Sequence, residues 1–418
     1  MKPVEPAALA RFLPAWQGIG AGRRGLDGLV EAVGALQGAA IPASTLDADV
    51  LPARVGGYRP ADLDGLCTAG DLVWTGAGAL GANDGRIRLY FRDQVALLAD
   101  RTPPDADDRP SGPLHDALRA HLAARGACFW ADLRAADTSA TDDELLAALW
   151  DLVWAGEVTN DSLAPVRAYV AGAAAKRSGG ATSPARSRPR PGRLTRLGPP
   201  SGAGRWSLVA PLLEPVPAAT VAAHALVMQL LERHGVLARE AVLAEGVPGG
   251  FAGVYGVLKV LEERGQVRRG YFVAGLGAAQ FALPGAVDRL RAAREADDDA
   301  EPVVLAATDP AQPYGAGLAW PDPVGGGRPA RVAGAFAVLL HGELAAWLDR
   351  RGHHLVTFPP AAGDDRWVEA LVHLVKDGRV RSLEVRKIDG GPAGESPHAA
   401  GLRAAGFADG YRGLVVRG

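Results

Sequence analysis

Cysteine and histidine are sparse in this chain, and their placement limits the chemistry that the protein can perform. Only Cys67 and Cys128 occur among 418 residues, and they form no CxxC pair. Isolated cysteines of this kind indicate a reducing compartment and exclude a zinc site built on paired cysteines. The nine histidines are scattered, with no spacing typical of metal ligands. We therefore expect no bound metal.

Long apolar segments and nucleotide-binding loops are also missing. The stretch MKPVEPAALARFLPAW lacks the charged region and apolar core of a signal peptide, and no run of about 18 apolar residues occurs. No GxxxxGK[ST] loop is present. GAGALG at 76–81 matches a dinucleotide-binding pattern, but an Asn-Asp-Gly turn and a strand follow it where a helix would be needed. We expect a cytoplasmic protein that contacts no membrane, binds no cofactor and hydrolyses no ATP.

Acidic and basic residues are nearly balanced, so a uniformly basic surface is excluded. The chain has 45 Lys plus Arg against 47 Asp plus Glu, a formal net charge of −2. A nucleic-acid-binding surface would therefore have to be local. Almost all of the basic residues are arginine, which binds phosphate bidentately wherever it clusters. The length allows several domains, each with its own core.

A winged-helix pattern is present in GVYGVLKVLEERGQVRRGYFVAGLGAAQFALP, residues 253–284. Val254, Val257, Leu258 and Leu261 are spaced as on one face of a helix, and Gly265 supplies the stop. Two short strands around a Gly-rich turn follow. HALVMQLLERHG and LAREAVLAEG supply two preceding helices, so three helices and a wing are predicted.

The same pattern occurs at two earlier places in the chain, at irregular spacing. In chain order these are the first and second copies, and the one at 253–284 is the third. RPADLDGLCTAGDLVWTGAGALGANDGRIRLYFRD predicts a helix from Pro60, a stop at Gly70 and two strands. TDDELLAALWDLVWAGEVTND predicts a helix, a stop at Gly156 and a strand. The chain therefore resembles a tandem array more than a regular solenoid.

The remaining segments differ in composition. From Ser162 to Leu213 there are nine Lys or Arg and no acid, in a background of Ser, Gly and Pro that predicts a flexible spacer or a basic strap on nucleic acid. Beyond the acidic run EADDDAEP the pattern is β-rich, and the last sixty residues alternate helix and strand. The expected fold is α+β, with tandem winged helix-turn-helix domains, a small β-barrel and an α/β cap. The expected boundaries are 1–100, 108–170 and 205–300 for winged helices, 171–204 for the linker, 301–360 for the barrel or sheet, and 361–418 for the cap.

Two basic and aromatic groups are candidate DNA contacts. The first lies at the end of the third-copy helix and in its wing, where winged helices meet phosphate and groove. The second surrounds the Gly-Gly loop in LPARVGGYRP, at 51–60. The alternative interpretation is solvated wing residues in the first group and a structural loop in the second. The residues are Arg264, Arg268, Arg269 and Tyr271 in the first group, and Arg54, Tyr58 and Arg59 in the second.

Three longer segments carry a resemblance to a known family. They are VLKVLEERGQVRRGYFVAGLGAAQFALPGAVDRLR, ATDPAQPYGAGLAWP and VLPARVGGYRPADLDGL. They resemble the C-terminal region of bacterial large helicase-related proteins, from about residue 3 to the end and without the ATPase half. That region is similar in architecture to the AlkZ-type DNA glycosylases. The resemblance implies DNA repair, uracil-DNA glycosylase activity as in some members, a homotetramer, and a helicase core as a partner in cis or in trans.

The resemblance also suggests catalytic candidates. The AlkZ-type motif is Gln, an apolar residue, then Gln or Asp, and ALQGAAIPAS matches it best, with the first position at Gln37 and Ala39 at the third. Because Ala39 cannot activate water, another acid would have to act, and Asp49 and Asp309 are the nearest candidates. Helix and turn capping is the alternative for both aspartates. Catalysis would take a damaged base out of the stack and use a carboxylate to orient water, without a metal.

Three functional hypotheses remain open at this point. The first is a DNA-repair module that binds single-stranded or damaged DNA and excises a base. The second is a non-catalytic DNA-binding and oligomerisation scaffold for a helicase motor. The third, a transcription regulator, is disfavoured because no ligand-binding domain accompanies the winged helices.

Overall fold

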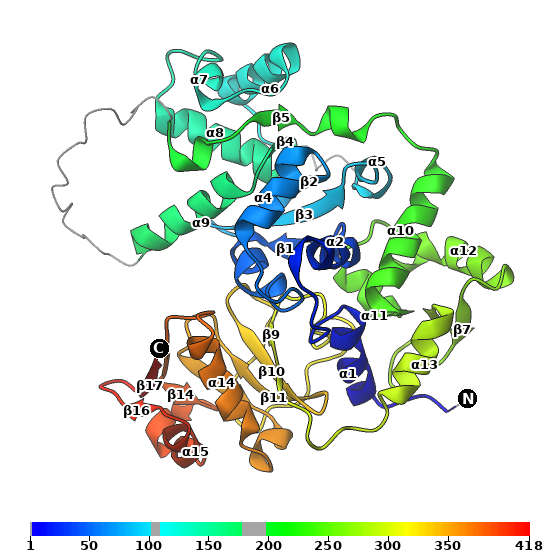
Figure 1. Cartoon of the computed structure of the whole chain (residues 1–418), viewed down its shortest axis with the longest axis vertical. Coiled ribbons are helices and arrows are strands. Elements are labelled where there is room, and N and C mark those ends of the chain that lie inside the picture. Colours follow the sequence, from blue (N-terminus) through cyan, green and yellow to red (C-terminus); the bar gives the residue numbers. More distant parts are fainter. Residues whose placement is uncertain (1, 102–108, 178–197) are drawn as a thin grey trace. The chain divides into compact units, whose positions relative to one another are not determined.

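The computed structural model describes residues 2–101, 109–177 and 198–418 and divides into two compact units (Figure 1). One unit contains residues 1–28, 47–56 and 226–418, and the other contains 29–46 and 57–225. Each unit is described by itself below. Among the residues that the structure describes, no helix is long and apolar enough to cross a membrane.

The first three-stranded sheet lies in the unit of residues 29–46 and 57–225, in the order β1-β3-β2. Its register pairs Ile41 with Ile87 and Thr75 with Arg88. Trp74, fully buried, anchors the sheet in the core. The sheet and the helices around it are α2 (Gly25–Leu36), β1 (Ile41–Pro42), α3 (Ala43–Thr45), α4 (Pro60–Ala69), β2 (Leu72–Ala79), β3 (Gly85–Phe91) and α5 (Val95–Leu98). This is the strand order of a winged helix, with residues 80–84 as the wing.

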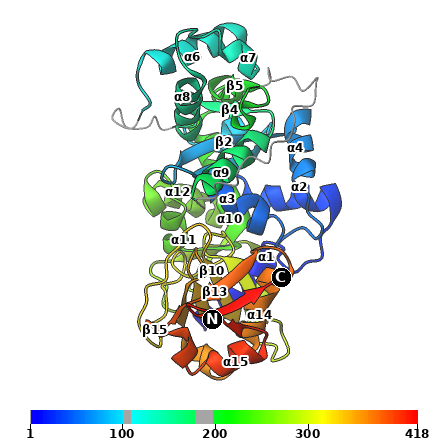
Figure 2. The same cartoon turned by 90° about the vertical axis from the view of Figure 1, so that its left-hand side faces the viewer.

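A second set of elements in the same unit repeats that order. Cys128 forms an isolated bridge with Trp206, and β5 pairs with β4, so the order is Cys128–β5–β4. The helices α6, α7 and α8 lie beside these strands (Figure 2). The elements are α6 (Pro113–Arg125), α7 (Trp130–Leu133), α8 (Asp142–Trp154), β4 (Val158–Asn160), α9 (Ala164–Arg177), η2 (Pro200–Gly202), β5 (Trp206–Leu208) and η3 (Ala210–Leu213).

This pairing changes the predicted boundaries. Residues 206–208 belong with the second copy, although the sequence pattern placed them at the start of the third. The basic segment therefore falls, in sequence, between two strands that pair with each other. Its first part, up to Arg177, is helical in α9. Residues 178–197, most of the predicted flexible linker, lie outside the described residues.

The third set of elements lies in the other unit and has the order β6-β8-β7. Val254, Leu258 and Leu261 are buried on one face of α12 and pack with Phe281, while Val257, predicted on the same face, is half-buried against them. Gly265 has a φ of 72°, which suits glycine at the helix end. The elements are α10 (Ala219–His234), β6 (Val236–Leu237), α11 (Arg239–Ala244), α12 (Gly250–Glu263), β7 (Arg268–Gly270), β8 (Gln280–Ala282) and α13 (Pro284–Ala292).

A six-stranded sheet follows, in the order β15-β14-β12-β11-β10-β9. Its two end strands do not pair with each other, so the sheet is open and the expectation of a closed barrel is wrong. Closure needs a consistent tilt and stagger of all strands, and here β12 and β14 pair in parallel while the other pairs are antiparallel. The strands are β9 (Val303–Ala306), β10 (Phe336–Leu340), β11 (Glu343–Leu348), β12 (His354–Thr357), β14 (Lys387–Ile388) and β15 (Gly391–Pro392).

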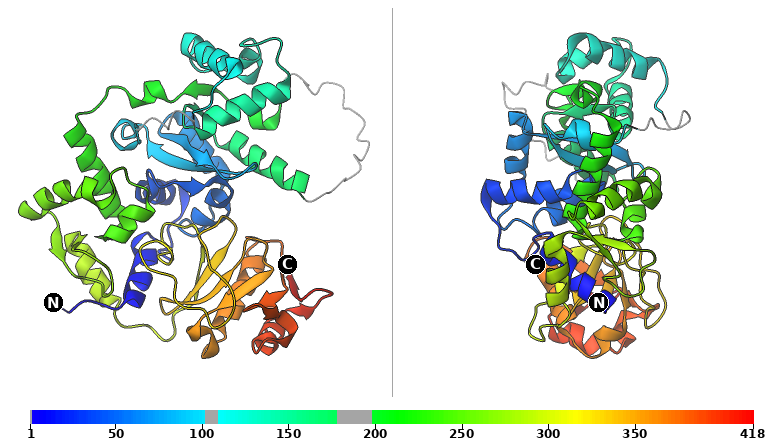
Figure 3. Two further views of the ribbon diagram at one scale, coloured as in Figure 1. Left: turned by 180° about the vertical axis from the view of Figure 1, so that it is seen from behind. Right: turned by 90° about the vertical axis from the view of Figure 1, so that its right-hand side faces the viewer.

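Both faces of this sheet are covered. Phe336 and Val338 pack with Trp367 of α14 (Arg366–Lys376) on one face. Ala337 and Leu339 belong to the cluster that contains Phe12 of α1 (Pro6–Trp16) on the other. Figure 3 shows α1, in dark blue, beside the yellow strands. A small α/β part completes the chain, with η4 (Pro359–Ala362), β13 (Ser382–Val385), η5 (Ala393–Glu395), α15 (Ala399–Ala404), β16 (Ala408–Asp409) and β17 (Leu414–Arg417).

Candidate functional site

Asp309 lies in a buried polar cluster that we call the Asp309 cluster, made of Gln17, Arg54, Asp309 and Arg331. The Arg54 guanidinium donates bidentately to Asp309, from Nη2 to Oδ1 at 2.7 Å and from Nη1 to Oδ2 at 2.9 Å. Nη2 also donates to Oε1 of Gln17 at 2.7 Å. The Arg54 residue is 2% exposed. Arg54 thus faces Asp309 and not solvent, so its guanidinium is unavailable for the phosphate contact that the Gly-Gly loop suggested.

Asp309 is fully engaged by its surroundings. Its Oδ1 also accepts the backbone N–H of Ala311 at 2.7 Å, which is the turn-capping contact considered from the sequence. Arg331 donates to the Asp309 carbonyl at 3.0 Å, and burial lowers the pKa of Arg331 to about 10. With both carboxylate oxygens bound by protein donors, Asp309 has a structural role in this arrangement.

Asp49 is buried in a different way. It lies in the π-helical turn η1 (Leu46–Val50), a rare geometry that occurs often at functional sites. Arg379 donates to Oδ1 from Nε at 3.1 Å and from Nη2 at 3.0 Å, and no described residue donates to Oδ2. The Phe336 ring lies 5.2 Å from the Arg379 guanidinium carbon and helps to hold it. Burial raises the pKa of Asp49, and the positive charge of Arg379 opposes the rise.

Gln37 belongs to the other compact unit. Its Nε2 donates to Oε1 of Gln94 at 2.8 Å, and its Oε1 accepts the N–H of Phe91 at 2.9 Å. The side chain is buried and ties the end of α2 to the end of β3. Although Gln37 and Asp49 are close in sequence, they lie in separate units.

The arginines of the third copy lie on the surface. Arg264 at the end of α12 and Arg268 and Arg269 in β7 are exposed, and Tyr271 is 65% exposed. Among the residues that the structure describes, Arg269 alone of these three arginines has an acidic partner, Glu262, at 3.7 Å. Fully buried Gln280 holds the start of the wing by accepting from the N–H groups of Phe272 and Val273. We call Arg264, Arg268, Arg269 and Tyr271 the basic wing surface.

The two other predicted contacts follow the Gly-Gly loop. Arg59 precedes α4 and is largely exposed, with its guanidinium paired to Asp62 at 2.7 Å. Tyr58 is half-buried. The three residues predicted around this loop are therefore not one surface, because Arg54 is buried in the Asp309 cluster while Arg59 faces solvent.

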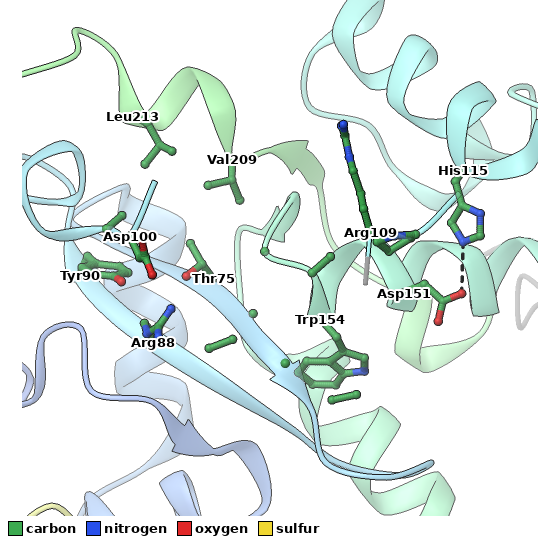
Figure 4. Close-up of a pocket in the computed structure, with 18 of the residues that line it drawn as sticks. Thr75, Arg88, Tyr90, Asp100, Arg109, His115, Asp151, Trp154, Val209 and Leu213 are labelled. Carbon is green, nitrogen blue, oxygen red and sulfur yellow. Dashed lines mark hydrogen bonds and ion pairs between the residues drawn. The ribbon is translucent and has the colours of Figure 1, made fainter. Parts of the chain in front are cut away.

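A cleft of about 770 Å³ lies in the unit of residues 29–46 and 57–225 and was missed by the sequence reasoning (Figure 4). The outer face of β2 and β3, the end of α8, the start of α6 and η3 form its walls. Arg88, Asp100, Arg109, His115, Asp151 and Trp154 are among its lining residues. The only sequence signal was GAGALG, which lies in β2 and the following turn and whose first residues line the cleft. No group of three or more His, Cys, Asp or Glu that could hold a metal occurs in the described parts of the chain.

The fold and the exposed arginines are those of a winged-helix DNA-binding protein. Two family models for winged-helix domains of large helicase-related proteins match residues 4–92 and 216–302. The chain therefore contains two winged-helix domains of the large helicase-related protein family and resembles the C-terminal region of its members.

Curated relatives and a solved structure agree with this assignment. "Lhr helicase/ probable uracil glycosylase" of Mycolicibacterium smegmatis is 43% identical over 407 residues, which is 93% of this chain and 26% of that protein. "Lhr helicase/uracil glycosylase" of Escherichia coli is 34% identical over 410 residues, with the same coverage. The chain thus spans about a quarter of the length of these relatives. The Streptomyces sahachiroi DNA glycosylase AlkZ has a similar fold, with a TM-score of 0.53 at 14% identity over 93% of this chain and 100% of AlkZ.

Proposed function

We propose that this chain is the DNA-binding module of a DNA-repair protein and that it excises uracil from DNA. The observation that carries the proposal is the alignment of 93% of the chain with two relatives whose names include uracil glycosylase. The exposed basic wing surface supports DNA binding, because solvent-exposed arginines at a wing can neutralise phosphates. The repeated strand order of Cys128, β5 and β4 leads us to infer a third, central winged helix in a tandem array.

Asp49 is the carboxylate that we assign to the chemistry. Excision of a base needs a group that orients or deprotonates water as positive charge develops on the sugar. Arg379 holds Oδ1 of Asp49, which leaves Oδ2 for a water. Burial raises the pKa of Asp49 and so makes its carboxylate a stronger base. Asp309 lacks such a free oxygen, and Gln37 serves here as a buried bridge.

The test is an excision assay on the whole chain. Uracil-containing single-stranded and duplex DNA would be incubated with the protein, abasic sites cleaved with alkali, and released uracil measured directly. The matched control is Asp47→Asn, which changes the other aspartate of the same π-helical turn. Excision by the native chain and by Asp47→Asn, with loss in Asp49→Asn, supports the assignment. Absence of released uracil from either strand form overturns the excision function.

A non-catalytic scaffold is the second candidate, and two observations favour it. Ala39 occupies the motif position expected to carry Gln or Asp, and Asp309 is fully engaged in the Asp309 cluster. In this case the chain would bind DNA, assemble as a homotetramer and serve a helicase core without chemistry of its own. Light scattering separates a tetramer from a monomer of 43.2 kDa, and a monomer mass at micromolar concentration contradicts the assembly.

A further inference from the structure

The cleft beside β2 contains hydrogen-bond donors that the protein itself does not satisfy. Arg88, from β3, is half-buried, and its guanidinium has no hydrogen-bond or ion-pair partner among the described residues. The indole Nε1 of Trp154 is buried and likewise has no partner in the described parts of the chain. Buried donors without acceptors cost free energy. Both residues line the cleft, but Nε1 of Trp154 is sealed by protein atoms, so the Arg88 guanidinium is the donor that a ligand rich in acceptor oxygens would satisfy.

The strand that forms one wall departs from regular pairing. The register of β2 on β3 shifts between Gly76 and Ala79, so Ala77 and Gly78 bulge out of the ladder where β2 lines the cleft. Bulges are common beside functional sites, because they free backbone N–H and C=O groups and redirect them. These freed groups suit the edge of a nucleobase, which carries both donors and acceptors.

Glycine fixes the distance between the walls. A Cβ on Gly76 would lie 1.8 Å from the Val153 carbonyl oxygen, and one on Gly85 would lie 2.3 Å from the Trp154 ring. Only glycine therefore allows β2 and β3 to approach the end of α8 this closely. The indole of Trp154 also packs against that of Trp150, with ring centroids 5.0 Å apart and ring planes tilted by 37°. The cleft is thus a fixed feature of the packing of this unit.

The other walls add charge and apolar surface. His115 contacts Asp151 at 3.1 Å (Figure 4). Arg109 pairs with Glu157 at 3.2 Å. Val209 and Leu213 contribute apolar atoms. A volume of about 770 Å³ is within the range of small-molecule sites. The cleft therefore offers a cation that has no partner among the described residues, an apolar wall and polar backbone groups. These match the phosphate, the base face and the base edge of a nucleotide.

We propose that this cleft binds one deoxynucleotide, with its phosphate on the Arg88 guanidinium and its base between the bulge of β2 and the apolar wall. The site rests on the proposed DNA-binding function and adds a second DNA contact to the basic wing surface. The nucleotide is a residue of a DNA strand or a free nucleoside monophosphate. The chemistry recognised is the same in both cases.

Binding measurements on the full chain test this site. Anisotropy of a fluorescein-labelled dT10 oligonucleotide measures strand binding, and calorimetry with dUMP measures free-nucleotide binding. Arg88→Ala should lower the affinity for the ligand that binds, dT10 or dUMP, by about tenfold or more, because a charge-assisted contact to phosphate is lost. The matched control is Arg86→Ala, an exposed arginine of the same strand that does not line the cleft. Ala77→Phe is the second variant, since it fills the cleft without removing charge, and circular dichroism melting verifies its fold.

The outcomes distinguish failure of the nucleotide site in the cleft from failure of the proposed DNA-binding function. If both cleft variants lose affinity for dT10 and Arg86→Ala does not, the site is supported and its nucleotide belongs to a DNA strand. If the native chain binds dUMP and Arg88→Ala does not, the site is supported and its ligand is a free nucleotide. Normal binding of dT10 and dUMP by both cleft variants overturns the site while leaving DNA binding intact. A native chain that binds neither DNA nor dUMP overturns the site and the DNA-binding function together.

Discussion

The Asp309 cluster and the basic wing surface place the same residue type in opposite environments. In the cluster, Arg54 is buried and donates to two side chains and the Val50 carbonyl. On the wing surface, Arg264 and Arg268 are exposed and unpaired among the described residues. Both groups stand beside Gly and Tyr in sequence, and both were candidate phosphate contacts. The difference shows that the acidic partner, and not the local pattern, decides whether an arginine supports the fold or is available to a ligand.

The largest effect is expected in the Asp309 cluster. Arg54→Met should destabilise the protein by about 3–5 kcal/mol, because it leaves the Asp309 carboxylate buried without its partner. Chemical denaturation followed by fluorescence measures the change. Arg59→Met is the control, since its pair with Asp62 is exposed and should contribute little. A stability equal to that of the native chain would contradict the structural role of Arg54.

Asp49 offers the next largest effect. Asp49→Asn should reduce uracil excision by roughly 100-fold or more while DNA binding is retained, as expected for loss of a general base. Burial raises the pKa of Asp49 above its usual 3.8. The base form is therefore lost as the pH falls through this raised pKa, and excision should decline on the acidic side. A pH profile that is identical in the native chain and in a still active Asp49→Asn variant would remove Asp49 from the mechanism.

The basic wing surface should control salt-dependent binding. Replacing Arg264, Arg268 and Arg269 by alanine should weaken duplex binding by about tenfold or more at low salt and reduce the salt slope by about 2–3. Stability should not change, because these side chains are exposed. Anisotropy titrations at several salt concentrations measure the slope, with the exposed Arg351→Ala as the control. An unchanged slope would mean that the wing does not contact phosphate.

Tyr271 should give the smallest effect. Tyr271→Ala should weaken single-stranded DNA binding by about fivefold, the lower end of what one stacked base contributes. Tyr271→Phe retains the ring and should bind as the native protein does. If both variants bind alike, the 65% exposed ring has no stacking role.

The winged helices could be predicted from sequence because their signals are local. The spacing of Val254, Leu258 and Leu261 and the stop at Gly265 lie within twelve residues and match the buried face and end of α12. The segment of the six-stranded sheet was predicted as β-rich, but its open edge depends on which strands pair, and β14 begins thirty residues after β12 ends. Local patterning does not carry that information.

The site was predicted less well for the same reason. Arg54 and Asp309 are 255 residues apart, so their pairing could not be seen in either segment. Asp49 was singled out from its neighbours in sequence, whereas its partner Arg379 lies 330 residues away. The cleft depends on the close approach of Gly76 to Val153, which GAGALG indicates only as a glycine-rich strand end.

The pairing of β4 with β5 has a consequence for a chain that has been cut. The two strands flank α9 and residues 178–197, and fully buried Trp206 sits on the far side of that interval. Asp161 and Arg205 join the two sides through an ion pair at 2.9 Å and a backbone hydrogen bond. A single cleavage within 178–197 therefore yields two polypeptides that share one core. Such halves should co-purify under native conditions and separate only in denaturant.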